Sequence, residues 1–290
     1  MLKQRKAFLM VVTIAFLACM NTFLYNYVQT AISYQKLLHQ LQEMKMDMEL
    51  FRNMAFTEES LQTILDKKMD DNASYEMASM TMLINRYVCD QEALQCSKQL
   101  SEHVRQELEQ TQLYQDLYER YQLLLSDLVY FPVPLDWKGN YTTSYDDSWN
   151  AARTYGGNRR HEGTDIMANT NIRGIYPIIS VSDGVVEQKG WLEQGGYRIG
   201  IRSKHGAYFY YAHLYSYAPD LSVGDTVYAG QLLGFMGDTG YSKIEGTTGN
   251  FDVHLHFGIY YMEGEEEVSV NPYYILKYLE KYTLTYSYGE

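Results

Sequence analysis

Two histidines separated by one residue, His254 and His256, lie in the segment NFDVHLHFGIYY. Apolar residues alternate there as they do in a β-strand, and side chains two positions apart on a strand point to the same face. Both imidazoles are therefore expected to project into one cavity. Upstream, the segment RRHEGTDIM carries His161 and Asp165 in an H-x3-D arrangement around Gly163. One imidazole of the pair, with His161 and Asp165, would supply two nitrogens and a carboxylate oxygen. Three protein ligands with one open position are typical of a catalytic zinc site.

Four motifs follow one another between about residues 150 and 272: HEGTD, an AHL that contains His213, VGDTVYAGQLLGFMGDTG, and VHLHF. In this order they resemble the lysostaphin-like, LytM-domain family of zinc metallopeptidases, which cut peptide bonds in bacterial peptidoglycan. The resemblance implies that His161, Asp165 and His256 bind one Zn²⁺ per chain, and that His213 and His254 are paired catalytic histidines. All five positions match the family pattern, which favours an active endopeptidase. The alternative is a non-catalytic scaffold or regulator of cell-wall or sporulation machinery with the same fold.

The chemistry fits these residue types. Zinc in an open site acidifies its water and polarises a scissile carbonyl, and a general base must then take up the proton. The chain has no HExxH glutamate, so His213 or His254 is the expected base, and the other would donate a hydrogen bond to the developing oxyanion. The sequence leaves these two roles open. Tyr155 is a candidate for substrate binding, and the peptidoglycan bond that is cut stays open.

The segment YFYYAHLYSY around His213 also has the composition of a strand. On a regular strand, His213 would share one face with Phe209 and Tyr211. Around it, glycine recurs every few residues between short β-like runs, which predicts an all-β sandwich or barrel. The resemblance implies that this is an antiparallel, LytM-like domain over residues 150–275. A short C-terminal helix and tail are expected over residues 276–290, and the prolines in YFPVPLDW indicate a linker over residues 132–149.

The 290-residue chain has a formal net charge of -12, which argues against a nucleic-acid partner. Residues 1–131 contain neither glycine nor proline, so this part is predicted to be helical. Apolar residues spaced by three and four favour a coiled coil or helical hairpin over residues 29–131. This region could support a homodimer. The helices, or the linker segment KGNYTTSYDDSWN, could also cover the substrate groove and place an Asn or Asp at the fourth zinc position, with Asn140 and Asn150 as candidates. Neither alternative is decided by the sequence.

The N-terminus combines basic residues with an uncharged run. Lys3, Arg5 and Lys6 precede residues 7–28, which would span a bilayer at about 1.5 Å per residue. The positive flank predicts a cytoplasmic tip at residues 1–6 and a single-pass anchor at residues 7–28. The protein would then lie in a bacterial cell membrane, with its C-terminal domain outside and facing the cell wall. Cleavage of this segment, or lipidation at Cys19, is left open.

Overall fold

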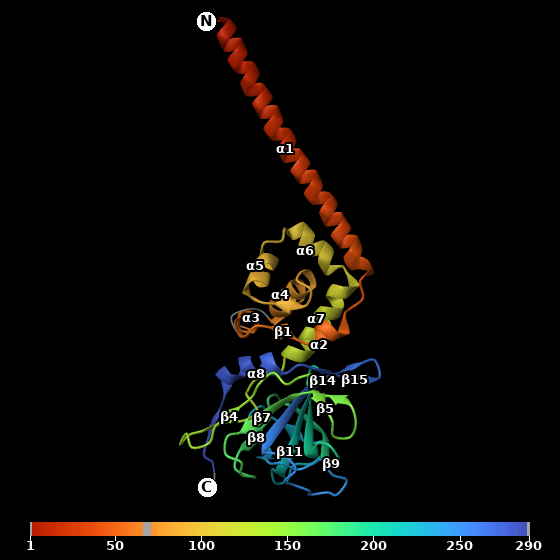
Figure 1. Ribbon diagram of the computed structural model, residues 1–290, viewed down its shortest axis with the longest axis vertical. Coiled ribbons are helices and arrows are strands. Elements are labelled where there is room, and N and C mark those ends of the chain that lie inside the picture. The colour runs from red at the N-terminus through yellow and green to blue at the C-terminus, as the bar shows by residue number, and fades with distance from the viewer. Residues whose placement is uncertain (1, 66–70, 289–290) are drawn as a thin grey trace.

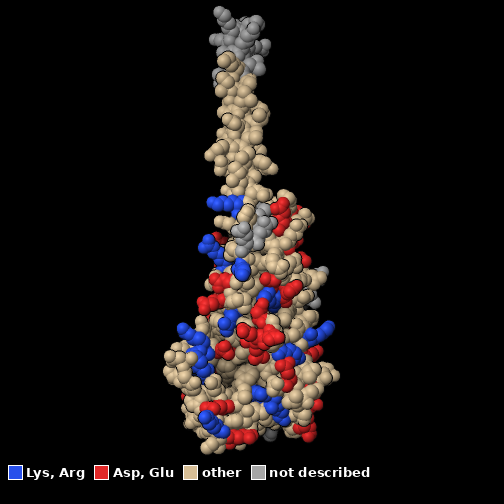
Figure 2. Space-filling model, turned by 90° about the vertical axis from the view of Figure 1, so that its right-hand side faces the viewer, with Lys and Arg blue, Asp and Glu red and all other residues tan. Residues whose placement is uncertain are grey.

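The computed structural model describes residues 2–65 and 71–288, with only the backbone given for some positions in the helices. It has three parts, which follow one another along its long axis (Figure 1): a projecting helix, a unit of short helices, and a β-rich domain. The first part is α1 (Leu2–Glu43), a helix of 42 residues that extends away from the rest of the molecule. Where its side chains are described, most of this helix is drawn in tan in Figure 2, without charged groups.

The predicted membrane anchor is not supported. Among the described residues, no helix has both the length and the apolar character that crossing a bilayer requires. Where the side chains of α1 are described, Asn21, Thr22 and Asn26 interrupt its apolar residues. This finding overturns the predicted location as a single-pass protein of a bacterial cell membrane. The anchor at residues 7–28 is not supported, and the membrane as a partner is not shown. The side chains of residues 1–6, the predicted basic tip, lie outside the described part.

The second part is a compact helical unit. Its longest helices have 14 residues, too short for the several heptads of a sustained coiled coil. The helices are confirmed, whereas the coiled coil is not shown. Within α7, the predicted stripe is buried at Tyr114, Leu117, Tyr121 and Leu124. The unit comprises α2 (Met48–Arg52), β1 (Ala55–Phe56), α3 (Glu58–Ile64), α4 (Asp71–Ile84), β2 (Val88–Cys89), α5 (Gln91–Lys98), α6 (Glu102–Glu109) and α7 (Gln112–Leu125).

The third part confirms the predicted antiparallel β domain. Its main sheet has the strand order β12-β9-β10-β11-β14-β7-β4, with β13 paired to β11 and β8, and β15 paired to β14. The strands of this sheet are β4 (Thr143–Ser144), β7 (Thr164–Ala168), β8 (Pro177–Ile179), β9 (Gly184–Leu192), β10 (Gly196–Ser203), β11 (Tyr208–Tyr217), β12 (Thr226–Val227), β13 (Leu232–Met236), β14 (His254–Glu263) and β15 (Glu266–Val270).

Smaller elements complete the domain. A parallel pair joins β3 (Leu135–Asp136) to β16 (Thr285–Tyr286), and a hairpin joins β5 (Ala152–Arg153) to β6 (Arg159–Arg160). The predicted C-terminal helix is α8 (Tyr273–Leu279), followed by a 3₁₀ turn at Glu280–Tyr282. Inside the domain, the central strands bury one face of alternating apolar residues, among them Leu255, Phe257 and Ile259 on β14. The other face carries the polar side chains of these strands, among them His254 and His256.

The helical unit docks on β14 and β15 through polar contacts. Arg120 of α7 forms a bidentate ion pair with Glu263, at 2.9 Å and 2.5 Å. Arg52 of α2 donates to the carbonyl of Ser269 at 2.7 Å, and its own carbonyl accepts from the backbone of Asn271 at 2.8 Å. These contacts tie the helices to the strand that carries the two closely spaced histidines.

We expect the Arg120–Glu263 pair to couple the two parts energetically. In a double-mutant cycle of Arg120→Gln and Glu263→Gln, urea unfolding should give a coupling free energy of about 1 kcal/mol, because the pair is bidentate and partly shielded from water. The matched control is Lys277 and Glu280, an i,i+3 pair within one surface segment, whose coupling should stay near zero. Equal coupling in both cycles would contradict an interdomain role.

Candidate functional site

Strand pairing brings a carboxylate and an imidazole together. Asp165 on β7 lies directly opposite His256 on β14 in the antiparallel register. Residues in direct register have their side chains a few ångströms apart on the same face. His256 Nδ1 is accordingly 3.0 Å from Asp165 Oδ1. The distance between two parts of the chain that are 91 residues apart is thus set by the sheet itself.

His161 completes this cluster from outside the strands. Its Nε2 is 3.0 Å from Asp165 Oδ1 and 2.9 Å from His256 Nδ1. The backbone of His161 is fixed by hydrogen bonds to the segment before the β5–β6 hairpin, from its N–H to Ala151 and from Asn150 to its carbonyl. Its Nδ1 is 2.9 Å from the carbonyl of Ser148. The Ser148 carbonyl calls for a proton on Nδ1, whereas Arg153 Nη2, 3.0 Å from the same nitrogen, calls for a lone pair, so these two contacts do not fix the tautomer of His161. In either tautomer Nε2 faces Asp165 and His256.

Gly163 makes the close approach of these groups sterically allowed. A Cβ atom at this position would lie 2.6 Å from His256 Cε1 and 2.6 Å from the carbonyl oxygen of Phe257. Real Cβ atoms do not come this near, and neither neighbour can move without disturbing β14. The glycine of the HEGTD motif therefore serves packing: it lets the loop that carries His161 lie directly against the strand that carries His256.

His213 reaches the same site through a β-bulge. Between Tyr211 and Leu214, two residues of β11 oppose one residue of β10, and His213 adopts a left-handed φ of 63°. The extra residue turns the imidazole away from the core face occupied by Tyr211 and toward the groove. The prediction that His213 shares a face with Phe209 and Tyr211 is therefore wrong, because it assumed an unbroken strand.

His213 and His254 have the same hydrogen-bond arrangement. Nδ1 of His213 is 2.7 Å from the carbonyl of Thr239, and Nδ1 of His254 is 2.7 Å from the carbonyl of Asp252. Each Nδ1 must carry the proton, which leaves each Nε2 with a lone pair. The two rings lie 4.7 Å apart between centroids, and Nε2 of His254 is 3.8 Å from Asp165 Oδ1.

Burial sets the charge states in the cluster. Burial lowers the pKa of His213 well below its usual range, and it also lowers the pKa of His254 and of His256. Burial alone would raise the pKa of Asp165, but its hydrogen bonds with His161 and His256 outweigh that effect and lower the pKa. Near neutral pH the site therefore holds an ionised Asp165 beside the neutral imidazoles of His213, His254 and His256, and for Asp165 and His256 these are the protonation states that a metal requires of its ligands.

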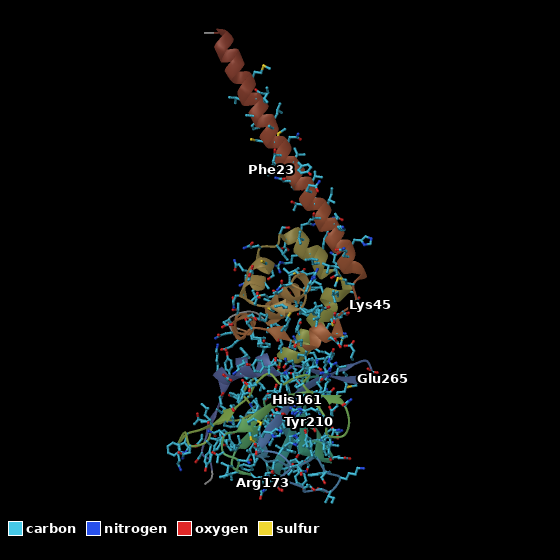
Figure 3. The ribbon with its side chains drawn as sticks, in the orientation of Figure 1. Phe23, Lys45, His161, Arg173, Tyr210 and Glu265 are labelled. Carbon is cyan, nitrogen blue, oxygen red and sulfur yellow. The ribbon has the colours of Figure 1, made fainter. Side chains whose placement is uncertain are left out.

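The five predicted residues line one groove with a volume of about 690 Å³, and all its lining residues lie between Arg153 and Glu267. His161 and Tyr210, both at this groove, lie close together in Figure 3, far from Arg173 at the opposite end of the domain. Neither Asn140 nor Asn150 is a lining residue, and among the described residues no part of the helical unit lines the groove.

The donor set fits a zinc ion. His161, Asp165 and His256 each offer one ligand atom, and these atoms lie within 4.8 Å of one another. Two imidazole nitrogens and a carboxylate oxygen form a common catalytic zinc ligand set. Two imidazole nitrogens and an anionic carboxylate oxygen meet here at about 3 Å. All three atoms could coordinate one divalent cation placed between them.

Tyr155, the predicted substrate-binding residue, is not a lining residue of the groove. It stacks on Tyr241, which does line the groove, with ring centroids 4.4 Å apart. Its role stays a prediction. The sequence analysis also missed Arg153, whose Nη2 donates to Asp165 Oδ2 at 2.5 Å. The signal for it was the glycine pair in RTYGGNRR, which indicates a hairpin that folds Arg153 back toward the HEGTD motif.

Comparison with known proteins agrees with this geometry. Residues 159–272 match Peptidase family M23. A solved structure from Ruminococcus gnavus ATCC 29149, provisionally assigned as the glycyl-glycine endopeptidase LytM, is 39% identical with a TM-score of 0.71, and the likeness covers 87% of this chain and 99% of that one. This chain belongs to peptidase family M23. Because so much of the chain is covered, the likeness to this M23 structure extends into the helical unit, beyond the 150–272 range of the sequence motifs.

Curated M23 relatives match over a shorter range. The L-Ala--D-Glu endopeptidase of Bacillus subtilis (strain 168) is 43% identical over 152 residues, which cover 52% of this chain and 44% of that protein. The glycyl-glycine endopeptidase ALE-1 of Staphylococcus capitis is 34% identical over 123 residues, which cover 42% of this chain and 30% of that protein. The matches therefore span less than half the length of either curated relative.

We expect Gly163→Ala to damage the site without unfolding the protein. The added methyl group would push the loop of His161 away from His256, so zinc affinity should fall by about 10- to 100-fold, measured by competition with a chelating dye. The control is Asn158→Ala in the exposed hairpin turn, which should keep wild-type affinity. Unchanged zinc binding in Gly163→Ala would contradict the packing role of this glycine.

Proposed function

We propose that the protein is a zinc metalloendopeptidase that hydrolyses peptide bonds in peptidoglycan. The observation that carries this proposal is the meeting of three metal-ligand atoms and two further histidines in one open groove. Membership of family M23, and relatives named as endopeptidases, support the reaction class. In this proposal His161, Asp165 and His256 hold one zinc ion, and His213 and His254 handle the proton.

The bound zinc ion would supply Lewis-acid chemistry, acidifying a water molecule and polarising the scissile carbonyl. The remaining steps belong to side chains. Nε2 of His213 or of His254 takes up a proton from the attacking water, because burial keeps both imidazoles neutral and their Nδ1 atoms are engaged by carbonyls. The imidazolium formed can return the proton to the leaving amine. Either imidazole could act as the general base, so we assign this role to the pair of His213 and His254 together.

Arg153 has a supporting part in this proposal. Its guanidinium donates to the Asp165 oxygen that does not face His161 and His256. A carboxylate whose second oxygen is fixed in this way presents its first oxygen in a defined direction, which stabilises a ligand geometry. The guanidinium also partly balances the negative charge of Asp165 in this buried setting, where an isolated carboxylate would be costly.

The bond that is cut is a matter for experiment. One relative is named for the L-Ala–D-Glu bond and another for the glycyl-glycine bond. Defined muropeptides with each bond can be incubated with the full chain, with and without zinc, and the released peptides identified by mass spectrometry. Zinc-dependent cleavage of either substrate supports the proposal. Absence of cleavage in both, by a protein shown to contain zinc, would favour the non-catalytic scaffold instead.

We expect the metal ligands to be essential for both zinc binding and hydrolysis. His161→Ala and His256→Ala should each reduce the bound zinc from one per chain to a small fraction, because two ligands leave the ion weakly held. Zinc content by atomic absorption and hydrolysis of purified cell wall should fall together. His205→Ala is the matched control, since His205 lies outside the groove and pairs with Asp127. Clear turnover by His256→Ala would refute the assigned metal site.

The paired histidines should behave differently from the ligands. His213→Ala and His254→Ala should retain zinc but lose about 10²- to 10⁴-fold in kcat, the range for removal of a general acid or base. The measurement is zinc content and kcat on the same preparations. A variant that loses its zinc, or that keeps kcat within about threefold of wild type, would remove that residue from the proton-handling pair.

A further inference from the structure

Arg198 lies on the floor of the groove, in line with the metal-ligand cluster. The residues before and after it on β10, Tyr197 and Ile199, pair with Leu214 and Tyr211, so Arg198 faces the bulge of β11 at Ala212 and His213. Ala212 in turn lies opposite His256 on β14. One row across the sheet therefore runs from Asp165 through His256 and Ala212 to Arg198. Neighbouring strands are about 4.8 Å apart, so the backbone of Arg198 is roughly 10 Å from that of His256.

The charge of Arg198 is not balanced within the protein. Among the described residues, no carboxylate lies within ion-pair distance of its guanidinium. Its Nη2 donates to the neutral Gln188 at 3.3 Å, and its Nη1 is shielded from solvent without a hydrogen-bond partner in the described part of the chain. A shielded donor on a charged group is costly when it is left unpaired.

The other arginines of the groove are already engaged. Arg153 is bound to Asp165, and Arg159 donates to the carbonyl of Tyr155 and the hydroxyl of Tyr241. Arg160 is exposed and donates to the carbonyl of Asn150. Arg202, four residues along β10 from Arg198 and not itself a lining residue, forms a bidentate pair with Glu187 at 2.6 Å and 2.8 Å. Among the described residues, Arg198 thus differs from these four in having neither a carboxylate nor a backbone-carbonyl partner for its guanidinium, only the side-chain amide oxygen of Gln188.

Two phenols add neutral hydrogen-bond donors near Arg198. Burial raises the pKa of Tyr208 to about 12 and also raises that of Tyr210, while the nearby charge of Arg198 opposes both rises. Both hydroxyls therefore stay protonated at neutral pH. Gly200 allows Tyr208 to lie across β10, since a Cβ atom there would overlap the Tyr208 ring. Cation and phenols together provide several donors and no anionic acceptor of their own.

We propose that Arg198 is the centre of a carboxylate-binding subsite, which selects peptides that carry an acidic residue one or two positions from the scissile bond. This inference rests on the proposed peptidase function and specifies its substrate. An extended peptide advances about 3.4 Å per residue, so the distance from the metal-ligand cluster to Arg198 corresponds to a neighbouring residue of the substrate, reached by its side chain. The planar guanidinium matches a carboxylate geometrically.

The attraction would be local. Figure 2 shows basic and acidic side chains interspersed over the β domain on the face in view, without a broad basic surface. Glu187 and Glu267 also line the groove, but Arg202 lies beside both, at 2.6 Å and 3.9 Å. Arg159 and Arg160 also line the groove and also lack a carboxylate partner among the described residues, but their guanidinium groups donate to neutral protein groups, whereas Nη1 of Arg198 has no partner there. An anionic ligand would therefore find a free donor at Arg198 in a groove that also holds two glutamates, which favours a single carboxylate over polyanions.

The test uses two blocked peptides that differ in one group. In the first, L-Ala is followed by D-Glu; in the second, D-Gln replaces D-Glu, so a carboxamide replaces the carboxylate. The full zinc-loaded chain should hydrolyse the acidic peptide with a kcat/KM about 10- to 100-fold above that for the amide. Arg198→Gln should remove most of this difference by slowing hydrolysis of the acidic peptide, with little effect on the amide. Arg198→Lys should retain part of the preference.

Two controls separate this inference from simpler explanations. Arg160→Gln removes a charge from the rim of the same groove and should leave the preference intact; an equal loss in this variant would overturn a specific role for Arg198. Loss of both activities in Arg198→Gln to the same degree would do so as well. The thermal unfolding midpoint and the zinc content of each variant show whether it is folded. If Arg198→Gln does not fold, Arg198→Lys takes its place as the test variant.

A binding experiment distinguishes failure of this inference from failure of the proposed function. Isothermal titration of both peptides into the zinc-free chain needs no hydrolysis. Binding of the acidic peptide about tenfold tighter than the amide, with the difference lost in Arg198→Gln, supports the subsite even if neither peptide is cleaved. Equal binding of the two peptides by the wild-type chain overturns the subsite, whether or not the chain proves to be a peptidase.

Discussion

The site depends on the close approach of three atoms that can coordinate a metal ion, two imidazole nitrogens and one carboxylate oxygen. His161 Nε2, His256 Nδ1 and Asp165 Oδ1 lie about 3 Å from one another, each pair at 2.9 Å or 3.0 Å. Bringing such groups together out of water is unfavourable unless a cation or a shared proton joins them. The fold supplies this energy through the register of β7 and β14, through the absence of a side chain at Gly163, and through the backbone contacts that hold the loop of His161 in place.

The main sheet separates stability from chemistry by its two faces. The buried face of β10, β11 and β14 carries Ile199, Phe209, Tyr211, Leu255 and Phe257, each with no exposed surface. The opposite face carries histidines, an arginine, phenols and glycines, with little that could form a core. The bulge in β11 violates this alternation at one position, where it moves His213 from the first face to the second. A left-handed conformation at a residue other than glycine costs of order 1 kcal/mol or more, so this displacement is sustained by the surrounding sheet and by the hydrogen bond to Thr239.

Local patterns in the sequence predicted much of this site. The features that they missed, the position of His213 and the presence of Arg198, depend on how distant strands pair. The period of two in VHLHF placed His254 and His256 on one face, and the H-x3-D spacing identified His161 and Asp165 as partners. The side of the sheet reached by His213 could not be predicted, because a bulge depends on how β11 pairs with β10. Arg198 was missed for a related reason: it is remote in sequence from every motif and comes near them only through strand order. The helical unit was recognised from the absence of glycine and proline. Several of its short helices begin at side-chain caps, Asp47, Thr57, Asp90 and Thr111, whereas the contact between α4 and α7 joins segments that are distant in sequence.

The balance of charge in the groove contrasts with that of the whole chain. A net charge of -12 repels anionic ligands at long range, yet at physiological ionic strength this repulsion fades over a Debye length of about 8 Å. Within the groove a short-range contact with a cation is screened far less, because protein surrounds it. An acidic peptide would therefore gain little from electrostatic steering and much from the contact itself. Selectivity of this kind appears in the lifetime of the bound complex more than in the rate of encounter. It requires a cation without a carboxylate partner in the protein, which is the condition of Arg198 among the described residues.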